Sequence, residues 1–132
     1  MKKILVDTSV IIDFFRRKDK EKSLLYRLAE EKYFMYISII THTELYAGKS
    51  VWENAEARNE LETVFSGLQL VPLESGVSEK AGEIRARAQI DLLDAIVAAS
   101  ALQHGLELAT FNTKHFQNIA GLTLFAFPTF SG

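Results

Sequence analysis

The chain has 132 residues, of which 48% are hydrophobic, so it can bury a sizeable core, and we expect one domain over residues 1–132. The lack of cysteine excludes disulfides and thiolate metal sites, and the formal charge of −2 argues against a protein that coats nucleic acid non-specifically. No apolar run approaches the roughly 18 to 20 residues of a membrane helix, and the start lacks a signal-peptide hydrophobic region. We therefore expect a cytoplasmic protein without membrane contact.

Apolar runs alternate with amphipathic stretches along the first half of the chain. Residues 3–6 predict a buried strand, and residues 8–16 predict a helix whose Val10, Ile11 and Phe14 share one face. The same periodicity predicts four further elements in this half: a helix over 22–34, a strand at 36–38, a helix that begins at residue 40 and a helix over 53–66.

The second half continues the alternation. It predicts a strand at 68–71, a helix over 75–89, a helix over 91–103, a strand at 106–110 and a fifth strand at 122–126. The helix over 91–103 is apolar nearly all round, which indicates burial. Strands alternating with helices favour an α/β fold, a parallel sheet covered on both faces. In such sheets the ligand crevice lies at the carboxyl ends of the strands, where the strand order reverses.

Three carboxylates stand where such a crevice would form. Asp7 ends the first strand, Glu44 lies in the first turns of the helix after the second strand, and Asp94 lies near the start of the buried helix. Mg²⁺ and Mn²⁺ prefer hard oxygen ligands, and clustered carboxylates repel one another unless a cation is present. A bound ion would lower the pKa of water and stabilise charge on a phosphodiester. If the acids converge, the pattern predicts a divalent-metal hydrolase.

Each acid also has a structural explanation. Asp7 could cap the following helix, although Thr8 or Ser9 could do so instead. Glu44 could be an exposed helix residue. Asp94 is harder to explain in this way, because it interrupts an apolar sequence, where an ionised carboxylate needs a partner or a metal.

Polar residues near these acids have open roles. Asn112 follows the fourth strand and could hold a phosphate oxygen or a metal-bound water, although asparagine is also an ordinary turn residue. For His115 a structural or surface role is favoured over contact with phosphate. We expect Asp91 to cap the buried helix, with a supporting role at the site as an alternative, and Asp13 to be a solvated or helix-edge charge. The basic segment 16–22 could face phosphate or solvent.

Four stretches, in order along nearly the whole chain, resemble the motifs of PIN-domain ribonucleases, specifically the VapC-type toxins of bacterial and archaeal toxin–antitoxin pairs. They are VDTSVIID at 6–13, SIITHTELYAG at 38–48, LDAIVAASAL at 93–102 and LATFNTKHF at 108–116. The resemblance implies a three-layer α/β/α sandwich with a central, mainly parallel sheet of about five strands. It also implies that Asp7, Glu44 and Asp94 are the metal-coordinating acids and that Asn112 belongs to the catalytic site.

The resemblance further implies Mg²⁺- or Mn²⁺-dependent endonucleolytic cleavage of RNA by metal-activated water. It implies a homodimer inhibited by a cognate antitoxin whose tail occupies the active-site groove, a heterotetramer or larger assembly with that antitoxin, and contact with DNA only through it. In the last motif many relatives have an aspartate, whereas here Asn112 and His115 stand in that segment. This departure leaves open whether one ion or two are bound.

Two alternatives differ in class from this hypothesis. A haloacid-dehalogenase-type phosphatase also has an acid after its first strand, but usually needs a second acid two residues later, where this chain has Ser9. A PIN-like module that binds RNA or protein without catalysis would retain the acids as structural caps. The sequence identifies neither the RNA nor the antitoxin, because selectivity depends on groove shape and local basic residues.

Overall fold

A computed structural model describes residues 2–126 of the chain. Within these residues, the strands form one parallel sheet in the order β3-β2-β1-β4. The strands are β1 (Lys3–Val6), β2 (Phe34–Ser38), β3 (Gln69–Val71) and β4 (Glu107–Ala109). The central strand β1 pairs with β2 on one side and with β4 on the other. The predicted parallel sheet is therefore confirmed.

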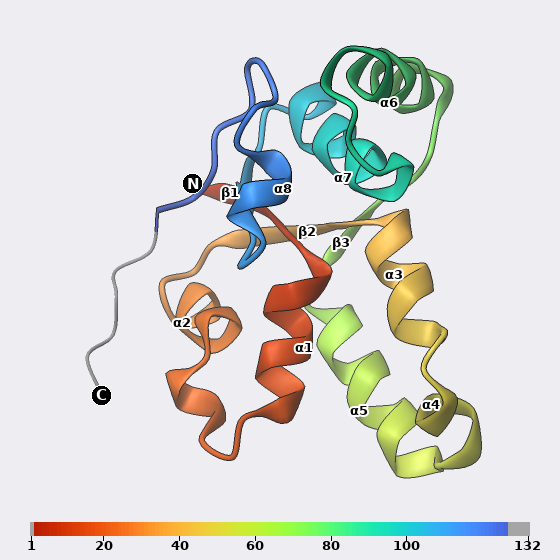
Figure 1. The fold of residues 1–132 in the computed structure, drawn as a ribbon. Helices are drawn as coiled ribbons and strands as arrows, with labels where there is room; N and C mark the ends of the chain where they lie inside the picture. Colours follow the sequence, from red (N-terminus) through yellow and green to blue (C-terminus); the bar gives the residue numbers. More distant parts are fainter. Residues whose placement is uncertain (1, 127–132) are drawn as a thin grey trace.

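Helices cover both faces of this sheet (Figure 1). In chain order they are α1 (Thr8–Arg16), α2 (Leu24–Glu30), α3 (Ile39–Tyr46), α4 (Lys49–Glu53), α5 (Ala55–Ser66), α6 (Ser75–Ala88), α7 (Leu92–Gln103) and α8 (Thr113–Phe116), with a 3₁₀ turn at Lys20–Lys22. Alternate residues of β1 serve two cores, because strand side chains point to opposite faces. Ile4 and Val6 pack with α1 and α2, whereas Leu5 packs with α6 and α7. This arrangement confirms the predicted three-layer α/β/α sandwich.

Helix α7 lies at the centre of one of these cores. Its residues from Ala95 to Ala101 are all buried, as its apolar sequence predicts. No helix among residues 2–126 combines the length and the hydrophobicity needed to cross a bilayer.

Several predicted boundaries were wrong for local reasons. The helix expected over 53–66 is divided at Asn54, whose side chain accepts hydrogen bonds from the backbone of Glu56 and Ala57 and so starts α5 anew. The helix expected over 22–34 ends at Glu30, because the chain turns at Lys32, which has a φ of 61°, into β2.

The fifth strand predicted at 122–126 is reduced to a single bridge. Leu124 pairs in parallel with Leu108, flanked by two backbone hydrogen bonds to Leu108. Conversely, the short helix α8 follows β4 where the sequence pattern indicates no helix. This helix is attached to the sheet by Phe116, which is 1% exposed.

Candidate active site

The site lies where the strand order reverses. The chain passes from β1 towards β2 and β3 on one side, while β4 pairs with the other side of β1. Asp7 follows β1 directly, and its backbone N–H donates to the carbonyl oxygen of Ala109 at the end of β4 (2.9 Å). The carboxyl ends of β1 and β4 are thereby held together at the position where parallel α/β sheets bind ligands.

The carboxylate of Asp7 is fixed by two hydroxyl groups. It is 6% exposed, and its Oδ2 accepts hydrogen bonds from Oγ1 of Thr110 (2.7 Å) and Oγ of Ser9 (3.0 Å). Asp7 is the N-cap residue of α1, yet its side chain makes no capping hydrogen bond. The interpretation of this side chain as a helix cap is therefore wrong, and its carboxylate is oriented by neighbours far apart in sequence.

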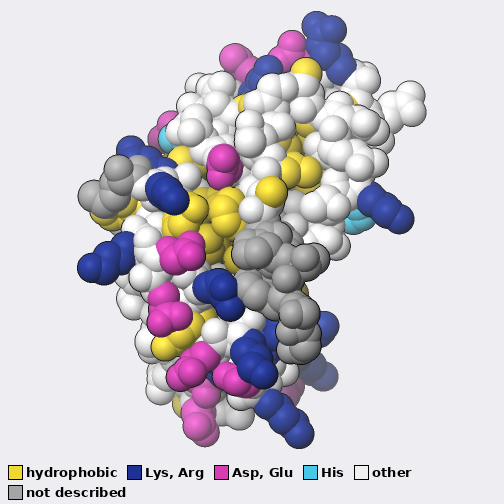
Figure 2. Space-filling model, turned by 90° about the vertical axis from the view of Figure 1, so that its left-hand side faces the viewer, with side chains coloured by type: hydrophobic (Ala, Val, Ile, Leu, Met, Phe, Trp, Pro, Cys, Tyr) yellow, Lys and Arg dark blue, Asp and Glu magenta, His cyan; other side chains and the backbone are white. Residues whose placement is uncertain are grey.

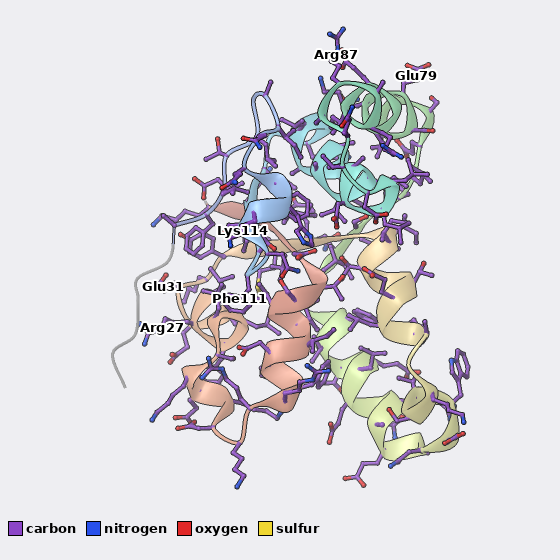
Figure 3. The ribbon with its side chains drawn as sticks, viewed as in Figure 1. Arg27, Glu31, Glu79, Arg87, Phe111 and Lys114 are labelled. Atoms are coloured by element: carbon purple, nitrogen blue, oxygen red, sulfur yellow. The ribbon has the colours of Figure 1, made fainter. Side chains whose placement is uncertain are left out.

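The same hydroxyl groups also position the segment after β4. Oγ of Ser9 accepts a hydrogen bond from the backbone N–H of Phe111 (3.1 Å), and Oγ1 of Thr110 accepts one from the backbone N–H of Asn112 (2.9 Å). Each hydroxyl thus links Asp7 to the backbone that carries Asn112. Figure 3 shows Phe111 beside the first turn of α1.

Removal of the Thr110 hydroxyl is expected to destabilise the protein. Thr110→Val keeps the shape of a side chain that is 1% exposed, but removes one of the two hydroxyl donors to the Asp7 carboxylate and leaves the Asn112 N–H without its acceptor. The expected loss is about 1–3 kcal/mol of unfolding free energy per unsatisfied group. Thermal or urea denaturation checks this, with Thr123→Val, at an exposed position, as the matched control. Equal stability of the two variants would contradict the prediction.

Glu44 reaches the site from α3. The Glu44 side chain is exposed, as its structural explanation predicted. Its Oε1 nevertheless accepts a hydrogen bond from Oγ1 of Thr8 (2.8 Å). The Thr8 hydroxyl also lies 3.0 Å from Oγ1 of Thr41, which is buried in the same helix. Thr8, the first residue of α1, therefore connects the Glu44 side chain to the residue that directly follows Asp7.

Asp94 lies in the first turn of α7, with its side chain 27% exposed. Nδ1 of His115 lies 3.2 Å from its Oδ2, so this exposed histidine contacts the site rather than the core. Burial raises the pKa of the Asp94 carboxyl, His115 acts to lower it, and the charges of Asp7 and Asp91 raise it further. Asp91 is the N-cap residue of α7 as expected, but its side chain makes no capping hydrogen bond.

One pocket of about 500 Å³ contains all the predicted site residues: Asp7, Glu44, Asp94 and Asn112. Sequence reasoning did not assign Asp13 and Phe111 to the site, although both line the same pocket, as does Arg16 of the predicted basic segment. Asp13 is half-buried and paired with Nε of Arg17 (2.9 Å), so it is a helix-edge charge rather than a fully solvated one. Asp13 and Arg16 follow Ser9, which lines the pocket too, at i+4 and i+7 on α1, and this helical spacing was the available signal.

The segment 16–22 is only partly available to a phosphate backbone. Arg17 pairs with Asp13, and Nζ of Lys20 donates to the carbonyl oxygens of Phe14 and Phe15 at the end of α1 (2.9 and 3.1 Å). Figure 2 shows basic and acidic side chains interspersed over the lower part of one face of the molecule. Arg16 is the member of this segment that lines the acidic pocket.

The donor set of the pocket fits a hydrated hard cation. Four carboxylates, those of Asp7, Asp13, Glu44 and Asp94, and the amide oxygen of Asn112 are oxygen ligands of the kind that Mg²⁺ and Mn²⁺ prefer. Among residues 2–126, no three His, Asp or Glu side chains form a group that could hold an ion by themselves. Mg²⁺ usually retains several waters and needs only one or two carboxylates in direct contact. The residues therefore suit an ion held partly through its water shell.

Comparisons with known proteins agree with this geometry. The PIN domain family model matches residues 4–122. Toxin FitB of Neisseria gonorrhoeae is 29% identical over 126 residues, which cover 86% of this chain and 90% of the relative. Ribonuclease VapC1 of Methanocaldococcus jannaschii is 31% identical over 122 residues, which cover 89% of this chain and 81% of the relative.

One solved structure is similar to this chain over nearly the whole length of both chains. It is a chain of a toxin–antitoxin complex from Klebsiella pneumoniae, with a TM-score of 0.73 and 28% sequence identity. The match covers 91% of this chain and 95% of that chain.

Proposed function

This chain belongs to the PIN domain family, and on that premise we propose that it is the toxin of a type II toxin–antitoxin system, a divalent-metal-dependent endoribonuclease. The observation that carries the proposal is the pocket at the carboxyl ends of β1 and β4, which Asp7, Glu44 and Asp94 line together. The similarity to Toxin FitB and to Ribonuclease VapC1 supports the toxin role and the ribonuclease activity, respectively. Family membership leaves the phosphatase alternative without support.

In this proposal Asp7, Glu44 and Asp94 hold Mg²⁺ or Mn²⁺. When bound, such an ion would supply a water molecule of lowered pKa and positive charge beside the phosphodiester. Ser9 and Thr110 fix the orientation of the Asp7 carboxylate, so that little rearrangement is needed on binding. Asn112 has its backbone tied to Thr110 and presents an amide that can donate to a phosphate oxygen.

The partners follow from the same family. The similarity to a chain of a toxin–antitoxin complex supports a cognate antitoxin as the inhibitor. In this proposal DNA is contacted only through that antitoxin. A homodimer, a heterotetramer or larger assembly with antitoxin, a single PIN domain over residues 1–132 and a cytoplasmic location complete the proposal. RNA cleavage is tested directly by mapping the 5′ ends of cellular RNA after induced expression. A discrete set of new ends is expected, and an unchanged RNA profile would contradict the proposal.

A divalent cation is expected to stabilise the native state. A ligand at 100 times its dissociation constant adds about 2.7 kcal/mol to the unfolding free energy when it binds only the folded protein. For a chain of this length this raises Tm by roughly 5–10 °C. Differential scanning fluorimetry with MgCl₂ or MnCl₂, against NaCl of equal ionic strength, measures the shift.

The matched variants for this measurement are Asp94→Asn and Asp19→Asn. The first removes a proposed ligand and is expected to abolish most of the shift. The second replaces the residue that caps the 3₁₀ turn, where asparagine caps equally well, and is expected to retain the shift. The same shift in both variants would place the bound ion elsewhere.

A further inference from the structure

Two further hollows adjoin the catalytic pocket. The first, of about 330 Å³, shares Asp94 with it and also contains Lys114 and His115 of α8. The second, of about 360 Å³, shares Ala88, Asn118 and Ile119 with the first. Through these shared residues the two hollows follow one another from Asp94 along α6 and the segment after α8, and the first of them borders the catalytic pocket. We call these two hollows the α6–α8 groove.

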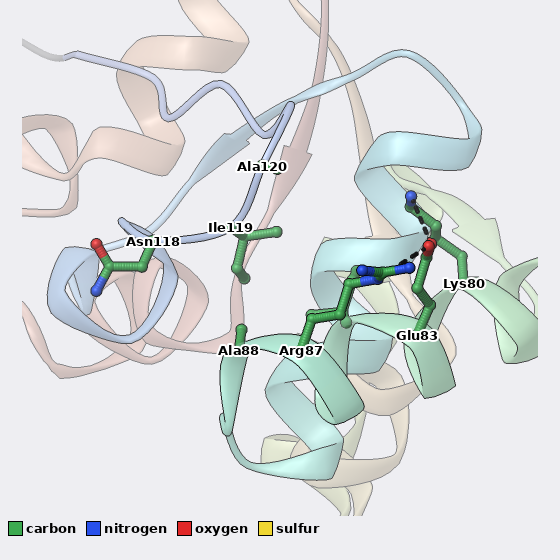
Figure 4. A pocket seen from close by; sticks show the side chains of 8 residues that line it. Lys80, Glu83, Arg87, Ala88, Asn118, Ile119 and Ala120 are labelled. Carbon is green, nitrogen blue, oxygen red and sulfur yellow. Dashed lines mark hydrogen bonds and ion pairs between the residues drawn. The ribbon is translucent and has the colours of Figure 1, made fainter.

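The chemistry of the α6–α8 groove differs from that of the acidic pocket. At its distal end the lining includes Ile84 and Ile119, which are only 6% and 7% exposed, and the exposed side chain of Asn118 lies on the segment that faces α6 (Figure 4). Glu83 in this wall is bracketed by Nζ of Lys80 (3.0 Å) and Nε of Arg87 (3.3 Å), so two cations outweigh one carboxylate.

Lys114 provides a cation near the Asp94 end of the groove. Its side chain is exposed on α8, and it forms no ion pair within residues 2–126. Figure 3 shows Lys114 on α8 and Arg87 on α6, on two different elements of the groove. Asp91 and Asp94 line the same hollow as Lys114. Exposed cations on two elements and the amide of Asn118 between them match a single nucleic-acid strand, whose phosphates contact Lys and Arg.

We propose that the RNA strand on one side of the scissile phosphodiester runs from the catalytic pocket along the α6–α8 groove. Lys114 contacts a phosphate next to the cleavage site, Arg87 contacts a more distal one, and a base lies within reach of the exposed amide of Asn118. RNA fits this surface better than a protein segment, because the groove shares Asp94 with the catalytic pocket and has an exposed cation towards each end. This inference rests on the proposed ribonuclease function.

The test uses steady-state kinetics on synthetic RNA that contains a mapped cleavage site. Lys114→Ala and Arg87→Ala are each expected to raise KM about fivefold, the effect of losing roughly 1 kcal/mol of phosphate contact, with kcat within about twofold. Each is also expected to reduce the slope of log KM against log salt concentration by roughly one phosphate contact. Lys49→Ala, at a side chain that is 90% exposed on α4, is the control and is expected to change neither quantity.

Substrate length provides a second and independent arm of the test. RNA shortened by several nucleotides on the groove side of the cleavage site is expected to raise KM for the parent enzyme and to remove the effect of Arg87→Ala. Equal effects on full-length and shortened RNA would overturn the groove path. Circular dichroism confirms that the variants are folded.

Failure of this inference is distinguishable from failure of the proposed function. If Arg87→Ala and Lys114→Ala leave KM and its salt slope unchanged while the parent enzyme still cleaves RNA, the groove proposal is wrong and the nuclease remains. The proposal is equally wrong if these variants weaken antitoxin binding with RNA kinetics unchanged, since the groove would then be a protein contact. A parent enzyme that cleaves no RNA would overturn the proposed function itself.

Discussion

Asp7→Asn and Asp94→Asn are each expected to abolish growth arrest and to lower RNA cleavage by at least about 10²–10³-fold, the scale observed when one group that stabilises a transition state is removed. Both substitutions remove a negative charge from the pocket shared with Glu44, where a cation must be held. Both keep nearly the same side-chain volume. The measurements are growth of the host after induced expression and cleavage rate of the purified variants at saturating Mg²⁺ or Mn²⁺.

Asp19→Asn serves as the control, because it makes the same chemical change at a turn outside the pocket. It is expected to remain fully toxic. Growth arrest that persists in both Asp7→Asn and Asp94→Asn would contradict the nuclease mechanism and favour a module that acts by binding alone. Loss of toxicity in the two variants, with their fold intact, would exclude that non-catalytic alternative.

The fold of Asp94→Asn is expected to persist for an electrostatic reason. Burial raises the pKa of the Asp94 carboxyl, so its ionised form is disfavoured in the native state. Above the pH at which the folded group titrates, a neutral asparagine avoids this penalty, although it loses the charge facing His115. Thermal denaturation at neutral pH in metal-free buffer should therefore show a variant at least as stable as the parent. The advantage should shrink as the pH falls and the parent carboxyl takes up its proton.

Phe116→Ala is expected to cost about 3–5 kcal/mol of unfolding free energy, the range for removal of a buried aromatic ring. Phe116 is 1% exposed and joins α8 to the core built around α7. For a chain of this length the loss corresponds to a fall in Tm of roughly 10 °C or more. Urea denaturation gives the free energy directly, provided that unfolding is two-state.

The control for this prediction is Phe34→Ala, because Phe34 is 42% exposed at the start of β2. It removes the same ring from a half-solvated position and is expected to cost about 1 kcal/mol or less. Similar losses in the two variants would show that α8 is not anchored to the core through Phe116.

The fold class and the three acids were predictable because their signals are local. The run Ile4-Leu5-Val6 indicates a buried strand, and an acid directly after it stands at the carboxyl end of that strand. Asp94 is conspicuous because its neighbours along the chain are apolar. The role of Glu44 was harder to predict from the sequence. Its side chain is exposed, and its position at the site depends on a hydrogen bond from Thr8, 36 residues away.

The element boundaries that were mispredicted depend on hydrogen bonds that the periodicity of apolar residues does not reveal. Asn54 sets the start of α5 because its side-chain Oδ1 accepts hydrogen bonds from two backbone N–H groups, and the periodicity of apolar residues does not reveal such a cap. Residues 122–126 have the composition of a strand but pair with β4 only at Leu108.

The periodicity of apolar residues was sufficient to predict the layers, the parallel sheet and the segments that carry Asp7, Glu44 and Asp94. It was sufficient because burial and strand ends depend on residues that are neighbours in sequence. The pairing of Thr110 with Asp7, the entry of Asp13 and Arg16 into the pocket and the groove between α6 and α8 arise from contacts between segments far apart in sequence. Such contacts depend on how helices are placed over the sheet, and no local pattern of residue types encodes that placement.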